Sequence, residues 1–215
     1  MNKTIILEKR PVGKPQLSDF KFTDTELPQI GANEVLLKTS LVSVDPYLRG
    51  RMSDAKSYSA PFQLQQPISS GIVAEVLESN NVAYTKGDFV SGLLEWKEFQ
   101  KSEGKGLLKV DPAKAPLSAY LGVLGMTGLT AYLGLTEIGR PKKGETLVVS
   151  GAAGAVGSVV GQIGKLLGCR VVGIAGTDEK AEMLKAKYGF DAAINYTTTS
   201  NMKEAIATAC PDGVD

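Results

Sequence analysis

Gly151-Ala152-Ala153-Gly154-Ala155-Val156-Gly157 follows a β-rich run at residues 146–150 and opens a helical pattern at residues 155–167. A glycine-rich turn between a strand and a helix is the setting in which proteins bind dinucleotide phosphates. Gly154 lets the backbone approach a pyrophosphate, and Gly157 lets the helix lie close to its strand, with the free N–H groups of the helix facing the anion. The sequence therefore predicts a dinucleotide-binding turn. A small-residue helix packed on a sheet without a ligand gives the same pattern.

The spacing of this turn departs from the G-x-G-x-x-G pattern at its first glycine. Ala152 occupies that position, and Gly151 comes directly before it. Because the first glycine of the pattern forms a tight turn, we expect the turn in this chain to accommodate a methyl group.

Strands and helices alternate around the turn. The predicted strands are residues 146–150, 170–175 and 192–194, and the predicted helices are residues 155–167, 178–188 and 201–209. This alternation predicts parallel β-α-β units and therefore an α/β fold of the Rossmann type. Three such strands are half of a doubly wound sheet, so we expect residues 125–215 to be the N-terminal part of a Rossmann domain in a truncated chain.

The first part of the chain has a different pattern. Its predicted strands are residues 3–7, 34–44, 70–77 and 88–92. Short strands separated by Asp-Pro, Gly-Asp and Asn-Asn breaks predict an antiparallel, barrel-like β domain. A helical connector begins after Pro116, and within it we place the boundary between domains 1–124 and 125–215.

The end of the second strand of the β-α-β region bears on the choice of dinucleotide. NAD enzymes usually have an acid there that binds the ribose 2′-hydroxyl, whereas a 2′-phosphate requires cations. The strand ends Ile174-Ala175-Gly176-Thr177 without a carboxylate, and Asp178-Glu179-Lys180 follows. Since Lys180 is within reach of a phosphate as a point charge, the sequence favours NADP over NAD. The same residues also suit a plain helix start, with Thr177 or Asp178 as N-cap and Lys180 in solvent.

A tyrosine in the first domain is the candidate catalytic residue. Asp45-Pro46-Tyr47-Leu48-Arg49-Gly50-Arg51-Met52 predicts a turn that places a phenol between two guanidinium groups. Tyr47 is one of the few acids left to a chain without histidine, so it is a candidate donor to a substrate oxygen that gains charge. A packing role for Tyr47 remains the alternative, and Arg49 and Arg51 fit a solvated face or ion pairs.

The composition excludes several kinds of chemistry. The chain has no histidine, which rules out Ser-His-Asp and Cys-His catalysis and removes the commonest zinc ligand. Cys169 and Cys210 are not part of a CxxC motif, so we expect free thiols, no metal site and a cytoplasmic location. With 24 Lys and Arg against 23 Asp and Glu, we expect no nucleic-acid partner. Residues 147–164 are uncharged, but their glycines fit a strand, turn and helix better than a membrane span.

Four motifs resemble those of the zinc-independent medium-chain dehydrogenases/reductases. They are Val44-Asp45-Pro46-Tyr47-Leu48-Arg49-Gly50-Arg51-Met52, Gly125-Met126-Thr127-Gly128-Leu129-Thr130-Ala131-Tyr132, the glycine-rich residues 149–162, and Asp178-Glu179-Lys180. The resemblance covers essentially the whole chain and is closest to the branch of leukotriene B4 12-hydroxydehydrogenase/prostaglandin reductases, plant 2-alkenal reductases and bacterial curcumin reductase. It implies a GroES-like β-barrel domain followed by a Rossmann domain.

The resemblance also implies an activity and its residues. Members of this branch use NADPH to reduce the carbon–carbon double bond of α,β-unsaturated ketones and aldehydes, without a metal. The residues that match the family's cofactor site are Gly154, Ala155, Val156 and Gly157 at the pyrophosphate, Lys180 and Tyr196 at the 2′-phosphate, and Met126 and Thr127 at the nicotinamide end. Tyr47 matches a tyrosine that lines the substrate site. A small-molecule enone or enal as substrate, no membrane partner and a homodimer of the full-length protein are implied as well.

Two other functions share these features. An NADPH:quinone oxidoreductase has the same glycine turn and the same lysine, and differs in the acceptor of the hydride. A non-catalytic NADPH-binding protein would bind the cofactor but would not oxidise NADPH with any electrophilic alkene.

Overall fold

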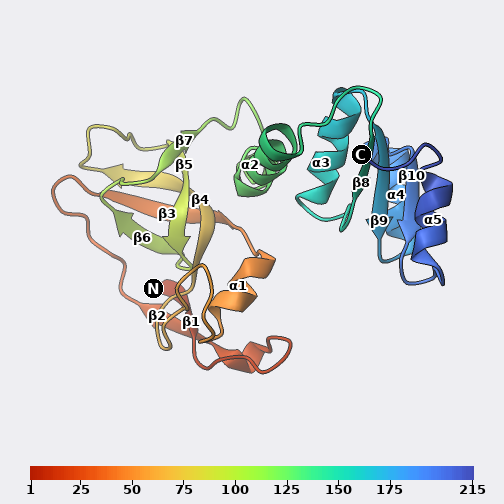
Figure 1. Ribbon diagram of the computed structural model, residues 1–215. Helices are drawn as coiled ribbons and strands as arrows, with labels where there is room; N and C mark the ends of the chain where they lie inside the picture. The colour runs from red at the N-terminus through yellow and green to blue at the C-terminus, as the bar shows by residue number, and fades with distance from the viewer. The chain divides into compact units, whose positions relative to one another are not determined.

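The computed structural model describes residues 1–215, which form two compact units, Met1–Leu121 and Gly122–Asp215 (Figure 1). The division falls at the end of a short 3₁₀ helix, η2 (Leu117–Leu121), three residues before the boundary expected from sequence. The first unit contains two sheets and the second contains one, and each unit has its own buried clusters.

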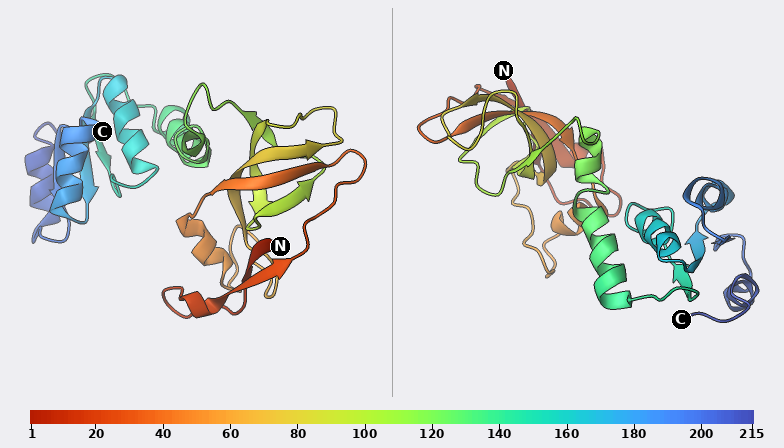
Figure 2. Two further views of the ribbon diagram at one scale, coloured as in Figure 1. Left: turned by 180° about the vertical axis from the view of Figure 1, so that it is seen from behind. Right: turned by 90° about the horizontal axis from the view of Figure 1, so that it is seen from above.

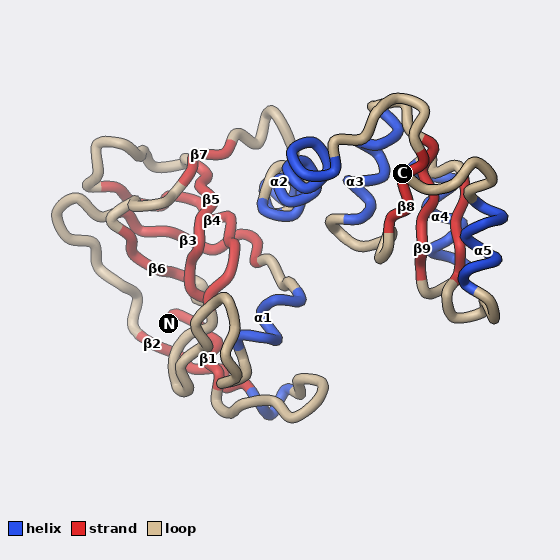
Figure 3. The backbone as a smooth tube through the Cα atoms, viewed as in Figure 1, coloured by secondary structure: helices blue, strands red, loops and turns tan.

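The first unit is built mainly from strands (Figure 3), and these strands pair antiparallel. A five-stranded sheet has the order β6-β3-β4-β5-β7, and β1 pairs with β2 in a separate two-stranded sheet. The strands are β1 (Asn2–Leu7), β2 (Phe20–Thr25), β3 (Val35–Val42), β4 (Ser69–Ser79), β5 (Phe89–Glu95), β6 (Phe99–Ser102) and β7 (Leu108–Val110). The sequence predicted β1, β3, β4 and β5 and missed the other three strands. Isolated bridges from Thr4 to Lys97 and from Ile6 to Pro67 tie β1 to the rest of the unit.

Two apolar clusters stabilise the first unit. The inner faces of β3, β4 and β5 supply one cluster, whose fully buried members are Val35, Leu37, Ile72, Ala74, Val76 and Val90. The other cluster joins β1 to a short helix, α1 (Pro46–Arg51), and consists of Leu7, Leu48, Met52, Phe62 and Ile68. A single-turn 3₁₀ helix, η1 (Leu17–Asp19), precedes β2. The sequence predicted a turn where α1 forms, and Pro46 occupies the first turn of this helix, where a missing N–H has no cost.

The second unit is a three-stranded parallel sheet with helices on both faces (Figure 2). Its strand order is β10-β9-β8, in which the chain moves one strand outward at each crossover. The elements are α2 (Met126–Leu133), the π-helical turn η3 (Gly134–Gly139), β8 (Thr146–Val149), α3 (Gly157–Leu166), β9 (Arg170–Ala175), α4 (Asp178–Tyr188), β10 (Ala192–Asn195) and α5 (Met202–Ala209). The parallel β-α-β units expected from sequence are therefore present.

The two faces of this sheet have separate cores. On the face covered by α3 and α4, Val171, Leu184 and Phe190 are buried together with Ala152 from the glycine-rich turn. On the opposite face, α5 packs Ile206 and its neighbours against Val172 and Ile194. Both faces are apolar, which explains why β9 is a continuous hydrophobic run rather than an alternating one. None of the helices is long and apolar enough to cross a membrane.

Candidate cofactor site

The glycine-rich turn leaves β8 and lies at the carboxyl end of the parallel sheet. Gly151 has a φ of +56°, and the N–H of Gly154 donates to its carbonyl at 2.9 Å. Ala152 is fully buried, and its N–H donates to the carbonyl of Ile174 at the end of β9. The conformation that requires glycine therefore falls on Gly151, and a methyl group at Ala152 contributes to the core. This explains how the turn tolerates alanine in the first glycine position of the pattern.

Gly157 allows α3 to start directly against this turn. A Cβ atom at this position would lie 2.5 Å from the carbonyl oxygen of Gly151 and 2.8 Å from the Cα of Ala152. Both neighbours are backbone atoms that cannot move aside without opening the turn. The close approach of helix and strand predicted from the sequence is therefore present, and it requires glycine.

The start of α3 has a row of free hydrogen-bond donors. The N–H groups of Ala155, Val156 and Gly157 have no acceptor in the protein, and the first N–H to be paired is that of Ser158, which donates to Gly154. No side chain caps this helix. Gly154 and Ala155 are exposed, so the donors surround an open position at the positive end of the helix dipole. Such a position binds an anionic oxygen, as in the pyrophosphate of a dinucleotide.

The turn between β9 and α4 contains the residues expected near the adenosine ribose of the cofactor. Thr177 is the N-cap of α4, and its hydroxyl oxygen accepts from the N–H of Lys180 at 3.3 Å. Asp178 accepts from the amide of Asn195 at 2.8 Å. Bonds to its own N–H and to the Thr177 hydroxyl hold the pKa of Glu179 below its ordinary value. Both acids therefore have local donors in or beside this turn.

Lys180 is the one lysine of α4 without a partner. Lys185 pairs with Glu182 at 2.8 Å, and the ammonium of Lys187 lies 5.6 Å from the ring centroid of Tyr188. Lys180 is exposed and forms no ion pair, although two acids directly precede it. An ammonium group that is free in this position is available to a phosphate.

Tyr196 lies at the end of the neighbouring strand. Its N–H donates to the carbonyl of Ala175 at 3.0 Å, which extends the pairing of β10 with β9 by one residue. Its side chain is 58% exposed, and a Cβ atom at Gly176 would lie 2.8 Å from its hydroxyl oxygen. The phenol therefore lies against the tip of β9. Lys180 and Tyr196 follow the carboxyl ends of adjacent parallel strands.

Met126 and Thr127 occupy the first turn of α2, which packs against α3. Met126 is 54% exposed. Thr127 is buried, and its hydroxyl donates to the carbonyl of Gly122 at 3.0 Å. Met126 thus presents a side chain to solvent, whereas the hydroxyl of Thr127 holds the start of its own helix.

Tyr47 belongs to the first unit. It is half-buried on α1 and packs against the cluster that contains Leu48 and Phe62. Its hydroxyl forms no hydrogen bond with the protein. Burial, and secondarily the charge of Asp45, raise the pKa of this phenol above its ordinary value. Tyr47 is therefore a neutral hydrogen-bond donor without a partner, and its ring packs against the buried cluster.

Neither arginine beside Tyr47 forms an ion pair, and both bond instead to backbone carbonyls while staying partly exposed. Arg49 donates to the carbonyls of Pro11 and Gly13, each at about 3.0 Å. Arg51 donates to the carbonyl of Ala60 and stacks 4.0 Å from the ring centroid of Phe62. Both guanidinium groups hold loops against α1.

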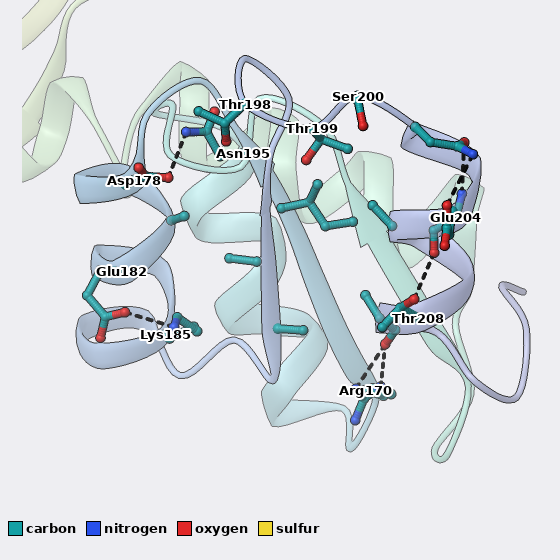
Figure 4. A pocket seen from close by; sticks show the side chains of 17 residues that line it. Arg170, Asp178, Glu182, Lys185, Asn195, Thr198, Thr199, Ser200, Glu204 and Thr208 are labelled. Carbon is teal, nitrogen blue, oxygen red and sulfur yellow. Dashed lines mark hydrogen bonds and ion pairs between the residues drawn. The ribbon is translucent and has the colours of Figure 1, made fainter.

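The contacts made by the segment after β10 were not predicted from the sequence. A groove of about 840 Å³ follows the outer edge of β10 between α4 and α5, with the Asp178–Asn195 pair at one end and Arg170 at the other (Figure 4). The predicted cofactor residues do not line it. Beyond it, the hydroxyl of Thr197 donates to the carbonyl of Gly176 at 2.8 Å. The only sequence signal for these contacts is an Asn and a Thr that flank Tyr196. No group of three or more acidic or cysteine side chains is arranged to hold a metal ion.

Two known protein families match separate parts of this chain. Residues 3–110 match the family described as N-terminal domain of oxidoreductase, and residues 155–215 match the family described as zinc-binding dehydrogenase. The fold and the glycine turn thus define a medium-chain dehydrogenase/reductase, with a GroES-like domain followed by a Rossmann-type domain, as predicted.

Similar proteins narrow this class to one branch. The chain is 57% identical to the "Putative NADP-dependent oxidoreductase YfmJ" of Bacillus subtilis, over 98% of this chain and 62% of that protein. It is 45% identical to the NADPH-dependent curcumin reductase of Escherichia coli, over 100% of this chain and 62% of that protein, and 49% identical to prostaglandin reductase 1 of the mouse, over 99% and 63%. The chain belongs to the zinc-independent branch of the medium-chain dehydrogenase/reductase family that contains these reductases.

Solved structures agree with this placement. CurA from Vibrio vulnificus has a TM-score of 0.92 and 45% identity, over 100% of this chain and 63% of that chain. The structure of the same CurA in complex with NADPH has a TM-score of 0.91 and 44% identity, over 99% and 63%. The chain spans somewhat less than two thirds of the length of the relatives it matches, 62% of the two bacterial ones.

Proposed function

We propose that this protein reduces the carbon–carbon double bond of α,β-unsaturated ketones and aldehydes with NADPH, and without a metal. The observation that carries the cofactor part is the unpaired Lys180, which follows a strand that has no carboxylate at its end. The substrate class is supported by the printed names of relatives: a curcumin reductase, prostaglandin reductases and a 2-alkenal reductase of Nicotiana tabacum that is 43% identical.

The residues present fit the parts of NADPH. The free N–H groups of Ala155, Val156 and Gly157, with the open backbone at Gly154, would hold the pyrophosphate. Lys180 and the hydroxyl of Tyr196 would hold the 2′-phosphate, and the exposed Met126 would cover the nicotinamide end while Thr127 fixes the start of α2. When bound, NADPH supplies a hydride.

Tyr47 would assist the substrate rather than the cofactor. Hydride addition at the β-carbon of an enone moves negative charge onto the carbonyl oxygen, and a proton is then taken up at the α-carbon. A neutral phenol that lacks a partner in the protein can donate a hydrogen bond to that oxygen. The raised pKa of Tyr47 keeps its proton in place through the physiological range.

The test is the oxidation of NADPH, followed by absorbance, with a panel of substrates. A 2-alkenal and an aryl enone should be reduced at the double bond, and the saturated ketone or aldehyde should be recovered. A benzoquinone should be reduced much more slowly. Preference for the quinone would replace the proposal with a quinone reductase, and binding of NADPH without turnover of any alkene would leave a non-catalytic nucleotide-binding protein.

We also propose a homodimer in the cytoplasm. A reducing compartment is supported by Cys169 and Cys210, which are both free and buried. Light scattering of the purified protein should give twice the mass of one chain, and a monomeric mass would contradict the dimer.

A further inference from the structure

The segment that follows β10 is bonded to the turn that follows β9. The amide of Asn195 donates to Asp178 Oδ1 at 2.8 Å, and Figure 4 shows this pair between the end of β10 and the start of α4. The hydroxyl of Thr197 donates to the carbonyl of Gly176 at 2.8 Å. The Oδ1 of Asn195 in turn accepts from the N–H of Thr197 at 2.9 Å, which fixes the orientation of the amide. These hydrogen bonds therefore join two loops that are separate in sequence.

This connection has an electrostatic consequence for the proposed 2′-phosphate position. Asp178 and Glu179 directly precede Lys180 and carry charge of the wrong sign for a phosphate. An acid in this region is also the group that binds the unphosphorylated ribose in NAD enzymes. A site that prefers NADPH must therefore hold these carboxylates in hydrogen bonds within the protein and leave the ammonium of Lys180 free.

The structure meets this requirement with neutral donors. The amide of Asn195 donates to the carboxylate of Asp178, and the N–H of Glu179 itself and the Thr177 hydroxyl lower the pKa of Glu179. If Lys180 instead neutralised either acid, it would not be available to the ligand, and no such ion pair is formed. An amide is suited to this task because it satisfies a carboxylate without adding a charge of its own.

We propose that Asn195 is a specificity-determining positioning residue: by holding the carboxylate of Asp178, it makes the turn after β9 selective for a 2′-phosphorylated adenosine. Thr197 supports this by fixing the carbonyl of Gly176. The inference rests on the proposed NADPH function and deepens it. Asn195 acts on the ligand through Asp178 and needs no contact with the ligand itself.

The experiment is calorimetric titration of the protein with two probes, adenosine 2′,5′-bisphosphate and adenosine 5′-monophosphate. They differ only in the 2′-phosphate, so the ratio of their dissociation constants measures selectivity alone. Asn195→Ala should weaken binding of the bisphosphate about threefold to tenfold, the effect of one partly screened charge. Binding of the monophosphate should change less than about twofold.

A second substitution separates this role from a general loss of structure. In the Asn195→Ala, Asp178→Asn double variant the carboxylate charge is gone, so the selectivity ratio should return at least to that of the parent protein. The matched control is Asn201→Ala, which removes a similar amide–carboxylate contact with Glu204 and the N-cap of α5. It should lower the melting temperature and leave the ratio unchanged.

Three outcomes would overturn the inference: equal loss for both probes in Asn195→Ala, no loss for either, or a double variant that remains as unselective as Asn195→Ala. A parent protein that binds the two probes equally would instead show that the proposed NADPH function is wrong, before any variant is considered.

Discussion

The two units treat their polar groups in opposite ways. In the second unit, three consecutive N–H groups at the start of α3 and the ammonium of Lys180 have no partner in the protein. In the first unit, each guanidinium group beside Tyr47 donates to at least one backbone carbonyl, whereas the phenol has no partner. A cationic side chain near a candidate site therefore points to ligand binding only where, as for Lys180, its charged group has no partner in the protein.

The difference follows from how each site is held. The sheet of the second unit positions backbone donors at the ends of strands, so the anion site needs few side chains. The short helix α1 has no such framework, and Arg49 and Arg51 supply it by joining α1 to the loops around Gly13 and Ala60.

The largest effect is expected at the close contact between α3 and the glycine turn. Gly157→Val would place side-chain carbon against the backbone of Gly151 and Ala152, at distances real structures do not show. The variant should lose about 3 kcal/mol of unfolding free energy and all measurable NADPH binding. Urea unfolding and cofactor titration would measure both. The control is Gly134→Ala, where nothing lies within 4 Å of the added methyl; equal losses in the two variants would contradict a specific role for this contact.

The next effect is expected at the free phenol of the first unit. Tyr47→Phe should lower kcat for an enone about tenfold to hundredfold and leave the KM for NADPH nearly unchanged. Because burial and the charge of Asp45 raise the pKa of the wild-type phenol, any loss of kcat from Tyr47 ionisation should begin at a higher pH than for an ordinary tyrosine. Tyr58→Phe, which changes a phenol that is 88% exposed, is the matched control. Unaltered turnover in Tyr47→Phe would leave this residue with packing alone.

Removal of the free ammonium should have a smaller and selective effect. Lys180→Ala should raise the KM for NADPH about tenfold, because a charge-assisted contact with the 2′-phosphate is lost, and should leave the KM for NADH within about twofold. Lys185→Ala removes a lysine of the same helix that is already paired with Glu182, and should change neither constant. Similar increases for NADPH and NADH in Lys180→Ala would show that the ammonium does not bind the 2′-phosphate.

The sequence predicted the parallel half of the fold more accurately than the antiparallel half. The bounds of β9 and α4 match the predicted ranges at both ends, because Thr177 caps the helix and Gly189 ends it with a φ of +72°. Those signals are local. The missed strands β2, β6 and β7 are short or largely exposed and exist because they pair with distant partners, as β6 does with β3. Their own residues carry little of that information.

The candidate site divides in the same way. The turn at residues 151–157 could be predicted because its glycines are required by backbone geometry. The bond from Asn195 to Asp178 and that from Thr197 to Gly176 could not, because each joins residues 17 or more positions apart and depends on the register of two strands. The hydrogen bonds from Arg49 and Arg51 to loop carbonyls could not be predicted for the same reason.

The smallest effect is expected at a carboxylate that stabilises the sheet under the site and has no role in binding. Burial alone would raise the pKa of Asp191, but the Lys165 ammonium at 2.8 Å and the N–H of Val171 at 2.6 Å outweigh it and hold the pKa below its ordinary value. A lowered pKa in the folded state stabilises the protein above the unfolded-state value of about 3.9, and this contribution is lost as the pH falls through the folded-state pKa. Asp191→Asn should therefore cost about 1 kcal/mol at pH 7, because solvent partly screens this carboxylate, and the difference from wild type should shrink below about pH 4. Glu182→Gln, which breaks a pair whose carboxylate is 66% exposed, should cost less than about 0.5 kcal/mol at any pH.

A loss in Asp191→Asn that stays constant down to pH 3 would mean that shape rather than charge matters at this position. NADPH affinity should be unchanged in both variants, because the charges that hold the sheet together are distinct from those left free for the ligand.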